Sequence, residues 1–329
     1  MLIADATTTR DLLPFDRLID ALRRAFGAAI EVPARHVHQV GPVGAPALGT
    51  SLIMPAWDAR FYGVKTVNIF AGNPGRGLPA LHSSYMLYDV TTGVPLALLN
   101  GDEITSRRTA AASALAASML ARPDAADLLV IGPGRIGRLV PLAMRAVLPI
   151  ARVSVWGRDA RAARECVEAL RGVGVSADVA PDLEAAVRAA DIVSCATLST
   201  APVVASEWLR PGSHLDLIGS FTPLMQEAHP SCFADASVWV DTMEALTKSG
   251  DLLRAFEAGA LRQEDVAGDL ARLCRQDGAA ASNDHDHTFD HAHDHKGRRR
   301  TVFKAVGTAL EDLAAASLVY EQLAGAPAA

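Results

Sequence analysis

The first third of the chain changes from a helical to a strand-like pattern of apolar residues. Over residues 11–30, apolar side chains recur every three or four positions, which predicts an amphipathic helix. From residue 32 to residue 99, short apolar runs are broken by glycine and proline. This pattern of short apolar runs predicts an antiparallel sheet, with turns at residues 72–75 and 92–93. Residues 102–121 are rich in alanine and predict a further helix.

The second half alternates between short apolar runs and stretches with helical spacing. Strands that alternate with helices in this way indicate a parallel sheet with crossover helices. Pro141 lies inside one predicted helix and is expected to kink it. The predicted strands are residues 128–131, 153–156, 175–179, 192–196, 213–218 and 238–240, and the predicted helices are residues 135–147, 160–171, 182–189 and 302–323.

Composition narrows the class of protein. A length of 329 residues suggests two domains, and a net charge of −6 argues against a general nucleic-acid binder. No apolar run reaches the roughly 18 residues that span a bilayer, so no membrane partner is expected. The N-terminus lacks a basic segment followed by an apolar core, which favours the cytoplasm. The four cysteines are widely spaced, which predicts buried thiols rather than disulfides or a zinc site.

A glycine motif follows the first predicted strand of the second half. Residues 132–137 read Gly-Pro-Gly-Arg-Ile-Gly, with a strand before them and a helix predicted after them. In that context the motif predicts a Rossmann dinucleotide-binding domain. Gly132 permits the tight turn, Gly134 lets the pyrophosphate approach the backbone, and Gly137 lets helix and strand pack closely. Arg135 and Ile136 complete this predicted cofactor-binding loop.

The end of the next strand indicates which cofactor binds. Enzymes that use NAD usually place an acid there, whereas NADP enzymes leave room for an arginine at the 2′-phosphate. The sequence has Arg158 at this position, so NADPH is favoured as cofactor. Asp159 follows directly. If the strand ended one residue later, Asp159 would occupy the selecting position, so NADH stays open as the alternative.

Several cationic residues of the first domain stand among apolar ones. Lys65 lies within the apolar run 61–70, and Arg108 begins an alanine-rich helix face. Arg35 and Arg107 are further candidates. A charge placed against buried surface needs a partner, and the carboxylate of an anionic substrate would serve.

The chain resembles the ornithine cyclodeaminase/μ-crystallin family over nearly its whole length. The resemblance rests on the motifs at residues 63–65, 93–101, 108–116, 132–137, 212–214 and 302–312. It implies an α/β fold, with a Rossmann dinucleotide-binding domain and an α+β substrate-binding and dimerisation domain. It also implies a homodimer, and a substrate carboxylate held by Arg35, Lys65 and Arg108. Lys65 and Arg108 are therefore the expected catalytic residues.

One loop distinguishes the branches of this family. Cyclodeaminases carry an aspartate shortly after the Gly-Ser-His strand, whereas this sequence has Ser220, Phe221 and Thr222 in that window. The loop resembles the branch that reduces pyrroline-2-carboxylate and piperideine-2-carboxylate. We therefore expect NADPH-dependent reduction of a cyclic imino acid, with Thr197 and Ser220 added to the cofactor site. The alternatives are an NAD-dependent ornithine cyclodeaminase and a crystallin-like protein that binds NADPH and a small ligand without turnover.

The resemblance also suggests domain boundaries. Residues 1–122, completed by residues 302–329, are expected to form the substrate-binding and dimerisation domain. Residues 123–301 are expected to form the NADP-binding domain. Within it, residues 283–300 are rich in His and Asp, which indicates a polar loop; metal binding is the alternative, although no metal site is assigned.

Overall fold

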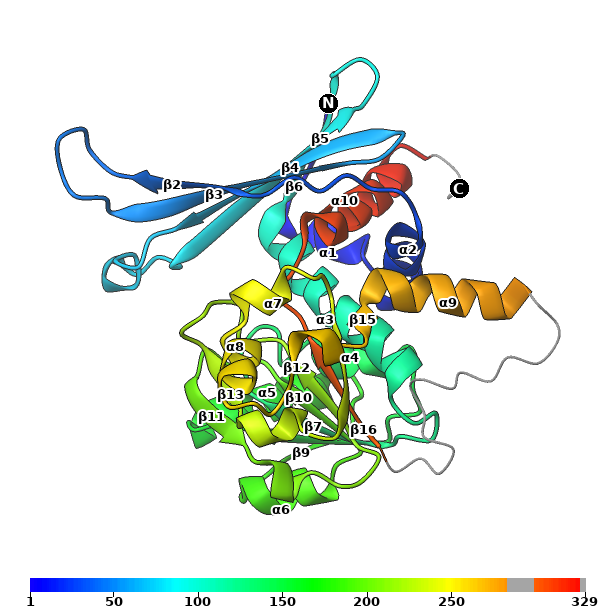
Figure 1. The fold of residues 1–329 in the computed structure, drawn as a ribbon. Coiled ribbons are helices and arrows are strands. Elements are labelled where there is room, and N and C mark those ends of the chain that lie inside the picture. The colour runs from blue at the N-terminus through cyan, green and yellow to red at the C-terminus, as the bar shows by residue number, and fades with distance from the viewer. Residues whose placement is uncertain (283–298, 326–329) are drawn as a thin grey trace. The chain divides into compact units, whose positions relative to one another are not determined.

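The computed structural model describes residues 1–282 and 299–325, and for residues 277–282 only the backbone. The chain divides into two compact units (Figure 1). Unit 1 comprises Met1–Arg108 and Thr308–Ala329, and unit 2 comprises Thr109–Gly307. The division falls within the alanine-rich helix α3 (Gly101–Leu120), which is present as predicted. In the described part of the chain, no helix is both long and apolar enough to cross a lipid bilayer.

Unit 1 is a six-stranded sheet with helices, and the antiparallel pairing predicted for residues 32–99 is confirmed. The strand order is β1-β6-β5-β4-β3-β2, with β1 parallel to β6. The strands are β1 (Leu2–Ala4), β2 (His36–Val40), β3 (Gly49–Trp57), β4 (Phe61–Ile69), β5 (Leu81–Asp89) and β6 (Pro95–Asn100), and the helices besides α3 are α1 (Ala6–Asp11), α2 (Phe15–Gly27) and α10 (Ala309–Leu323).

The helix predicted over residues 11–30 is the shorter helix α2, because Pro14 separates α2 from α1, which lies almost wholly before the predicted range. Proline disfavours the helical conformation of the residue before it, so α1 ends at Asp11. Helix α2 then begins at Phe15 with Pro14 as its N-cap residue. Proline lacks a backbone N–H, and at this position no N–H is needed for a hydrogen bond within the helix.

The two faces of the unit 1 sheet differ. Alternate residues of β4, among them Phe61, Lys65 and Val67, are buried on the side where α10 packs. Figure 1 shows the helices of this unit on that side. The opposite side, called the open face below, carries partly exposed apolar and aromatic residues, namely Trp57, Tyr62, Val64, Met86 and Tyr88.

Unit 2 is built on an eight-stranded sheet in which every pair of strands is parallel, as predicted for a Rossmann domain. Its order is β15-β14-β16-β12-β10-β7-β8-β9. The strands are β7 (Asp127–Ile131), β8 (Arg152–Trp156), β9 (Ala177–Val179), β10 (Ile192–Cys195), β12 (His214–Leu217), β14 (Ala236–Val240), β15 (Gly268–Asp269) and β16 (Arg300–Lys304), and a separate pair is formed by β11 (Thr200–Val204) and β13 (Gln226–Ala228).

Crossover helices follow most of these strands, close to the predicted positions. Because β9, β8, β7, β10 and β12 lie in the spatial order 3-2-1-4-5, the chain changes direction between β7 and β10. Dinucleotides bind at this switch point, outside the carboxyl ends of the strands. The helices are α4 (Val140–Arg145), α5 (Ala160–Gly172), α6 (Leu183–Ala189), α7 (Ala245–Lys248), α8 (Gly250–Glu257) and α9 (Leu270–Ser282).

Two predictions for unit 2 were wrong. The start of the helix predicted over residues 302–323 is instead strand β16, which pairs with β12 and β14 in the middle of the sheet. A short apolar run fits a buried strand and a helix equally well, and burial between two strands decides the outcome. The helix predicted over residues 135–147 begins only at Val140, so Pro141 lies in its first turn and kinks nothing.

Candidate functional site

The glycine-rich loop follows β7 at the switch point of the unit 2 sheet. Gly132 has a φ of +104°, and a Cβ atom there would lie 2.5 Å from the carbonyl oxygen of Ala196. A Cβ atom on Gly137 would lie 2.0 Å from the carbonyl oxygen of Gly132. The protein's own backbone therefore requires glycine at these two positions.

Gly134 differs from these two glycines, because a Cβ atom there would meet nothing within 4 Å. Gly134 and Arg135 are exposed, and Ile136 is partly buried in the turn that leads to α4. Open space above an exposed turn leaves room for a ligand to approach the backbone N–H groups, as a pyrophosphate does in dinucleotide-binding loops.

A cavity of about 290 Å³ lies beside this loop. Its walls include Gly132, Pro133, Trp156, Arg158 and Thr197, and they are mostly apolar. A mostly apolar wall that includes one cation suits a nucleotide, whose base is apolar on its faces and whose phosphates are anionic.

Arg158 and Asp159, the two candidates for cofactor selection, have different surroundings. The Asp159 carboxylate caps α5 and accepts a hydrogen bond from the Arg161 backbone N–H at 2.9 Å. Arg158 is exposed at the cavity and has no ion-pair partner among residues 1–282 and 299–325. Asp159 is therefore already engaged by the helix, whereas the guanidinium of Arg158 is available to a ligand.

Thr197 and Ser220 occupy loops at the carboxyl ends of β10 and β12. Thr197 lines the cavity. Ser220 is fully buried, and its hydroxyl donates to the carbonyl of Met225 at 2.7 Å and accepts from the Asp251 N–H at 3.1 Å. The hydroxyl of Ser220 thus holds its own loop together.

In unit 1, the two predicted catalytic cations are buried beside a pair of acids. Lys65 on β4 forms an ion pair with Asp312, with 2.6 Å between Nζ and Oδ2. Arg108 on α3 pairs with Asp312 at 3.0 Å and with Glu311 at 2.6 Å. Lys65 is 2% exposed and Asp312 is not exposed at all. The structure therefore brings Lys65 and Arg108 together through the carboxylates of α10.

The environment shifts the titration of these groups. Burial lowers the pKa of Lys65 to about 8, although the charge of Asp312 opposes this effect. Burial acts to raise the pKa of Asp312, but Lys65 and Arg108 together hold it below its usual range. Arg108 has its pKa raised because Glu311 and Asp312 outweigh its desolvation. At neutral pH the pair of cations is charged.

This cluster leaves hydrogen-bond donors for a ligand. Lys65 donates to Thr105 at 3.3 Å and pairs with Asp312, so a third N–H of its ammonium has no partner among the described residues. Arg108 uses Nε and Nη1 for the two acids. Its Nη2 group has no partner in the part of the chain that the structure describes, and an anion can bind there.

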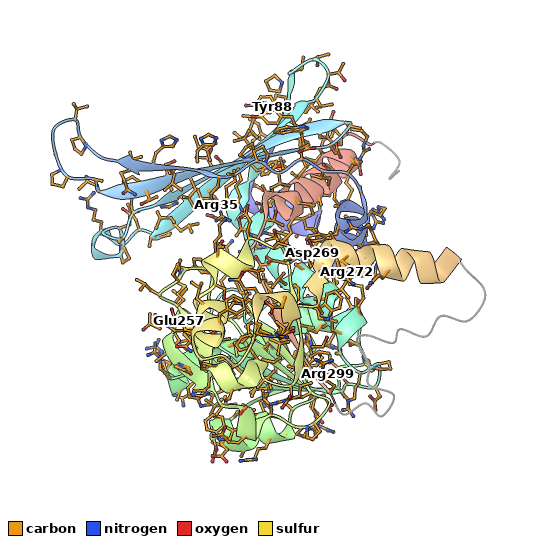
Figure 2. All side chains as sticks on the ribbon, in the orientation of Figure 1. Arg35, Tyr88, Glu257, Asp269, Arg272 and Arg299 are labelled. Atoms are coloured by element: carbon orange, nitrogen blue, oxygen red, sulfur yellow. The ribbon has the colours of Figure 1, made fainter. Side chains whose placement is uncertain are left out.

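The other two candidate cations belong to other segments of unit 1. Figure 2 shows Arg35 on the segment that leads into β2, where it is partly buried. Arg107 donates to the carbonyl of Leu13 at 2.7 Å and lies over the ring of Phe15, so it fastens α3 to the N-terminal helices.

Sequence reasoning missed the roles of Glu311 and Asp312. Their signal was two adjacent acids in an otherwise apolar helical run, which indicates buried carboxylates in need of cationic partners. Another buried acid, Asp216 on β12, accepts hydrogen bonds from Ser113 at 2.9 Å and Ser194 at 2.6 Å. Burial raises the pKa of Asp216 to about 6.

The described residues contain no group of three or more His, Cys, Asp or Glu arranged to hold a metal ion. The His-rich segment that was predicted as a polar loop lies outside these residues, apart from Arg299 and Arg300. The four cysteines are buried, as expected from their spacing.

Comparison with known proteins adds four findings. The profile of the ornithine cyclodeaminase/mu-crystallin family matches residues 16–326. A Delta(1)-pyrroline-2-carboxylate reductase of Paracoccus denitrificans is 39% identical over 283 residues, which is 85% of either chain. The solved Delta(1)-pyrroline-2-carboxylate reductase of Thermococcus litoralis, in complex with NADH and L-proline, superposes over 100% of both chains with a TM-score of 0.85 and 28% identity. An archaeal alanine dehydrogenase dimer with bound NAD also has a TM-score of 0.85 and 28% identity, over 99% of this chain and 96% of the other.

Proposed function

The chain belongs to the ornithine cyclodeaminase/mu-crystallin family, and on that premise we propose that it is an NADPH-dependent reductase of a cyclic imino acid. The proposed substrates are Δ1-pyrroline-2-carboxylate and Δ1-piperideine-2-carboxylate, which would give L-proline and L-pipecolate. Two relatives named above carry the first of these substrates in their names, and one of them was solved with L-proline.

The observation that carries the proposal is the buried pair of cations in unit 1. Lys65 and Arg108 are charged and nearly inaccessible, yet each keeps N–H donors without a partner among the described residues. Asp312 and Glu311 balance the two charges formally, so the cluster is stable before any ligand arrives. An incoming carboxylate would take up the remaining donors, which suits a small imino acid. We propose Arg35 as a third ligand of that carboxylate.

The residues of the glycine-rich loop and its cavity fit a nicotinamide dinucleotide. Gly134 leaves the backbone N–H groups open to a pyrophosphate, and Gly132, Arg135, Ile136 and Gly137 form the turn around it. The cavity beside the loop would take the adenosine end. These features support the cofactor class that solved relatives bind.

We propose NADPH rather than NADH as the preferred cofactor. Arg158 has no ion-pair partner among the described residues and can pair the 2′-phosphate in a bidentate way. Asp159, the acid that argued for NADH, uses its carboxylate to cap α5. The loop residues Thr197 and Ser220 would shape the cofactor site from the neighbouring strands.

The reaction then needs few groups from the chain. Lys65 and Arg108 neutralise the substrate carboxylate and orient the ring, and holding the ring in one pose is a large part of what proteins contribute to such a reaction. When bound, the nicotinamide supplies the hydride that reduces the imine carbon, and one proton is taken up at the ring nitrogen. Because Lys65 must be charged to bind the carboxylate, and its pKa is lowered by burial to about 8, we expect kcat/KM to fall on the alkaline side of that pH.

A cyclodeaminase is the enzymatic alternative, and two features argue against it. The loop over residues 219–225 contains no acid that can act on a substrate amine. Asp216 is the acid just before this loop, but it is fully buried and held by two serine hydroxyls. Ammonia release from ornithine would establish the alternative.

We also propose a homodimer formed through unit 1. The open face of its sheet carries a row of aromatic rings, with ring centroids of Trp57 and Tyr62 at 6.2 Å and of Tyr62 and Tyr88 at 5.4 Å. A partly exposed face of this composition favours a protein partner, and one solved relative is a dimer. Sedimentation or light scattering would test this state. We also propose a cytoplasmic location, with which the four free thiols agree.

The test is oxidation of NADPH by the purified protein with each imino acid, repeated with NADH. Turnover with a preference for NADPH would support the proposal, and the ratio between the two rings would identify the better substrate. If neither imino acid is reduced and ornithine releases ammonia, the cyclodeaminase reading holds instead. If the protein binds NADPH without any turnover, it acts as a binding protein.

A further inference from the structure

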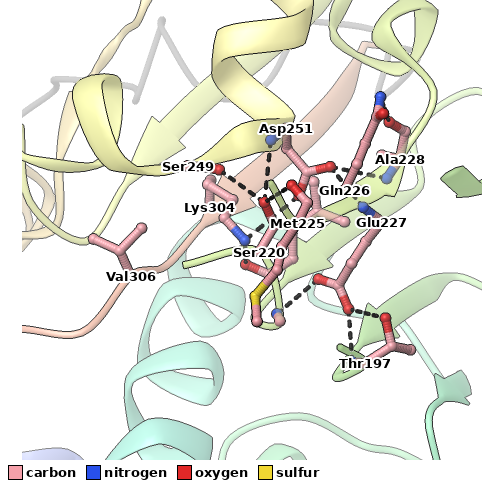
Figure 3. Close-up of polar contacts among 12 residues, drawn as sticks. Thr197, Ser220, Met225, Gln226, Glu227, Ala228, Ser249, Asp251, Lys304 and Val306 are labelled. Atoms are coloured by element: carbon pink, nitrogen blue, oxygen red, sulfur yellow. Dashed lines mark hydrogen bonds and ion pairs between the residues drawn. The ribbon is translucent and has the colours of Figure 1, made fainter. Parts of the chain in front are cut away.

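A single buried carboxylate ties together the two loops at the switch point of the unit 2 sheet. Glu227 lies on β13, and its side chain is not exposed. One carboxylate oxygen accepts from the backbone N–H of Thr197 at 2.7 Å and from the Thr197 hydroxyl at 2.8 Å. The other oxygen accepts from the backbone N–H of Gly219 at 2.7 Å (Figure 3). The loops that follow β10 and β12 therefore share one anchor.

The anchored loops are packed against each other without spare room. A Cβ atom on Gly219 would lie 1.9 Å from the carbonyl oxygen of Thr197. On its other side, Thr197 meets the glycine-rich loop, because a Cβ atom on Gly132 would lie 3.0 Å from Thr197 Cγ2. Thr197 also lines the 290 Å³ cavity. Thr197 therefore connects Glu227 with the wall of that cavity.

A second buried acid holds the anchor itself. Asp251, at the start of α8, accepts from the backbone N–H groups of Glu227 at 2.8 Å and of Ala228 at 3.0 Å. Lys304 of β16 lies 3.5 Å from Asp251 and donates to the carbonyl of Leu217 at 3.0 Å. Figure 3 shows this group of contacts around Glu227. Asp251 of α8 therefore fixes the backbone at Glu227, and Lys304 of β16 lies beside Asp251.

Joining two loops through a buried carboxylate costs free energy, because an ionised group loses its hydration when it is buried. Burial raises the pKa of Glu227 to about 7, Lys304 opposes this shift, and Asp251 adds to it. Three donors converge on Glu227, so the cost is offset only when both loops stand in this arrangement. Groups of this kind concentrate where a fixed geometry is needed for function.

We propose that Glu227 is a positioning residue of the cofactor site, which holds Thr197 against the glycine-rich loop so that the nucleotide cavity is formed before the cofactor binds. The inference rests on the proposed function in one respect, namely that the cavity receives a nicotinamide dinucleotide. Preformed walls spare a ligand the free energy of ordering the loops, so the anchor acts on cofactor affinity rather than on the chemical step.

The test is the variant Glu227→Gln. Its amide has one acceptor oxygen, so its NH₂ group must face the N–H of either Thr197 or Gly219, and one of the two loops is released. We expect the Kd for NADPH to rise about tenfold or more. The KM for NADPH should rise with it, while kcat at saturating NADPH stays within about twofold of wild type, because the chemical step is untouched.

Asp191→Asn is the matched control. Asp191 accepts from the backbone N–H groups of Ala126 and Asp127, both at 3.0 Å, near the amino ends of β7 and β10. It is a largely buried carboxylate of the same unit, but it lies at the opposite edge of the sheet from the glycine-rich loop. This variant should lose thermal stability as Glu227→Gln does, yet keep its Kd for NADPH within about twofold of wild type.

Thr197→Val supplies a second measurement if Glu227→Gln does not fold. Valine keeps the shape of Thr197 but removes the hydroxyl that donates to Glu227, so the Kd should again rise. Wild type that binds neither NADPH nor NADH would refute the proposed function and this inference together. Wild type that binds while both variants bind as tightly, or an equal loss of affinity in Asp191→Asn, would refute the positioning role alone.

Discussion

The charge balance of unit 1 makes Asp312 the most informative residue to change. Its carboxylate is fully buried and contacts both cations, Lys65 at 2.6 Å and Arg108 at 3.0 Å. The variant Asp312→Asn keeps the size and shape of the side chain but removes the charge and replaces one acceptor oxygen with an NH₂ group, which must face Lys65 or Arg108. Lys65 and Arg108 would then share the single charge of Glu311, which contacts Arg108.

The expected loss of stability is large because Lys65, which is buried, would lose the carboxylate that forms its ion pair. Removal of one partner from a buried ion pair typically lowers the free energy of unfolding by about 3–5 kcal/mol. For a unit of this size such a loss corresponds to a fall in the unfolding midpoint of about 10 °C. Thermal and denaturant unfolding, followed by circular dichroism, would measure both quantities.

The same variant should shift the pH dependence of activity. The charge of Asp312 works against the burial that lowers the pKa of Lys65 to about 8. Without that charge the pKa of Lys65 falls further, so Lys65 becomes neutral at a lower pH. The decline of kcat/KM for the imino acid on the alkaline side should therefore begin at lower pH in Asp312→Asn than in wild type.

Glu321→Gln is the control on the same helix. Glu321 pairs with Arg60 at 2.8 Å, but the Arg60 side chain is 51% exposed. An ion pair of that kind contributes only about 0–1 kcal/mol, so this variant should unfold close to wild type and keep its pH profile. If Asp312→Asn loses less than about 1 kcal/mol, the reasoning that α10 balances the charge of Lys65 and Arg108 is wrong.

Four further predictions follow from the site. Lys65→Ala and Arg108→Ala should each abolish NADPH oxidation with an imino acid while the Kd for NADPH stays within about twofold; an active variant would contradict the assignment. Arg158→Ala should weaken NADPH binding about tenfold or more and leave NADH binding unchanged, as titration calorimetry would show; equal losses would exclude the 2′-phosphate contact. Gly137→Ala should abolish binding of either cofactor in the same measurement, because its Cβ would lie 2.0 Å from the carbonyl oxygen of Gly132. In wild type, kcat/KM should fall as pH rises through about 8, since Lys65 loses its proton there; a flat profile to pH 10 would count against a role for its charge.

Local patterns were enough to predict most elements of unit 2. The alternation of strands and helices and the glycine motif after β7 depend on spacing within a few dozen residues, and the structure confirms them. The same reasoning failed at β16, where an apolar run that reads as a helix is a strand in the centre of the sheet. Its identity depends on two neighbouring strands that lie far from it along the chain.

The antiparallel sheet of unit 1 was predictable for the same reason as the Rossmann strands, but the surroundings of its cations were not. Sequence spacing could mark Lys65 as a charge within an apolar strand. It could not show that Asp312 would meet Lys65, or that the carboxylate of Asp159 would cap a helix rather than stay available for a ribose. These outcomes depend on where each side chain points once the elements have packed.

The sequence by itself therefore determined the family, the succession of elements and the glycine-rich loop, because these depend on residue type and on short-range periodicity. Only the tertiary structure decided how the buried charges are partnered. Arg108 and Asp312 are 204 residues apart along the chain, and Thr197 and Glu227 are 30 apart, yet each pair lies within hydrogen-bonding distance. A buried charge is stable only with a partner, and folding, not spacing along the chain, determines which partner it meets.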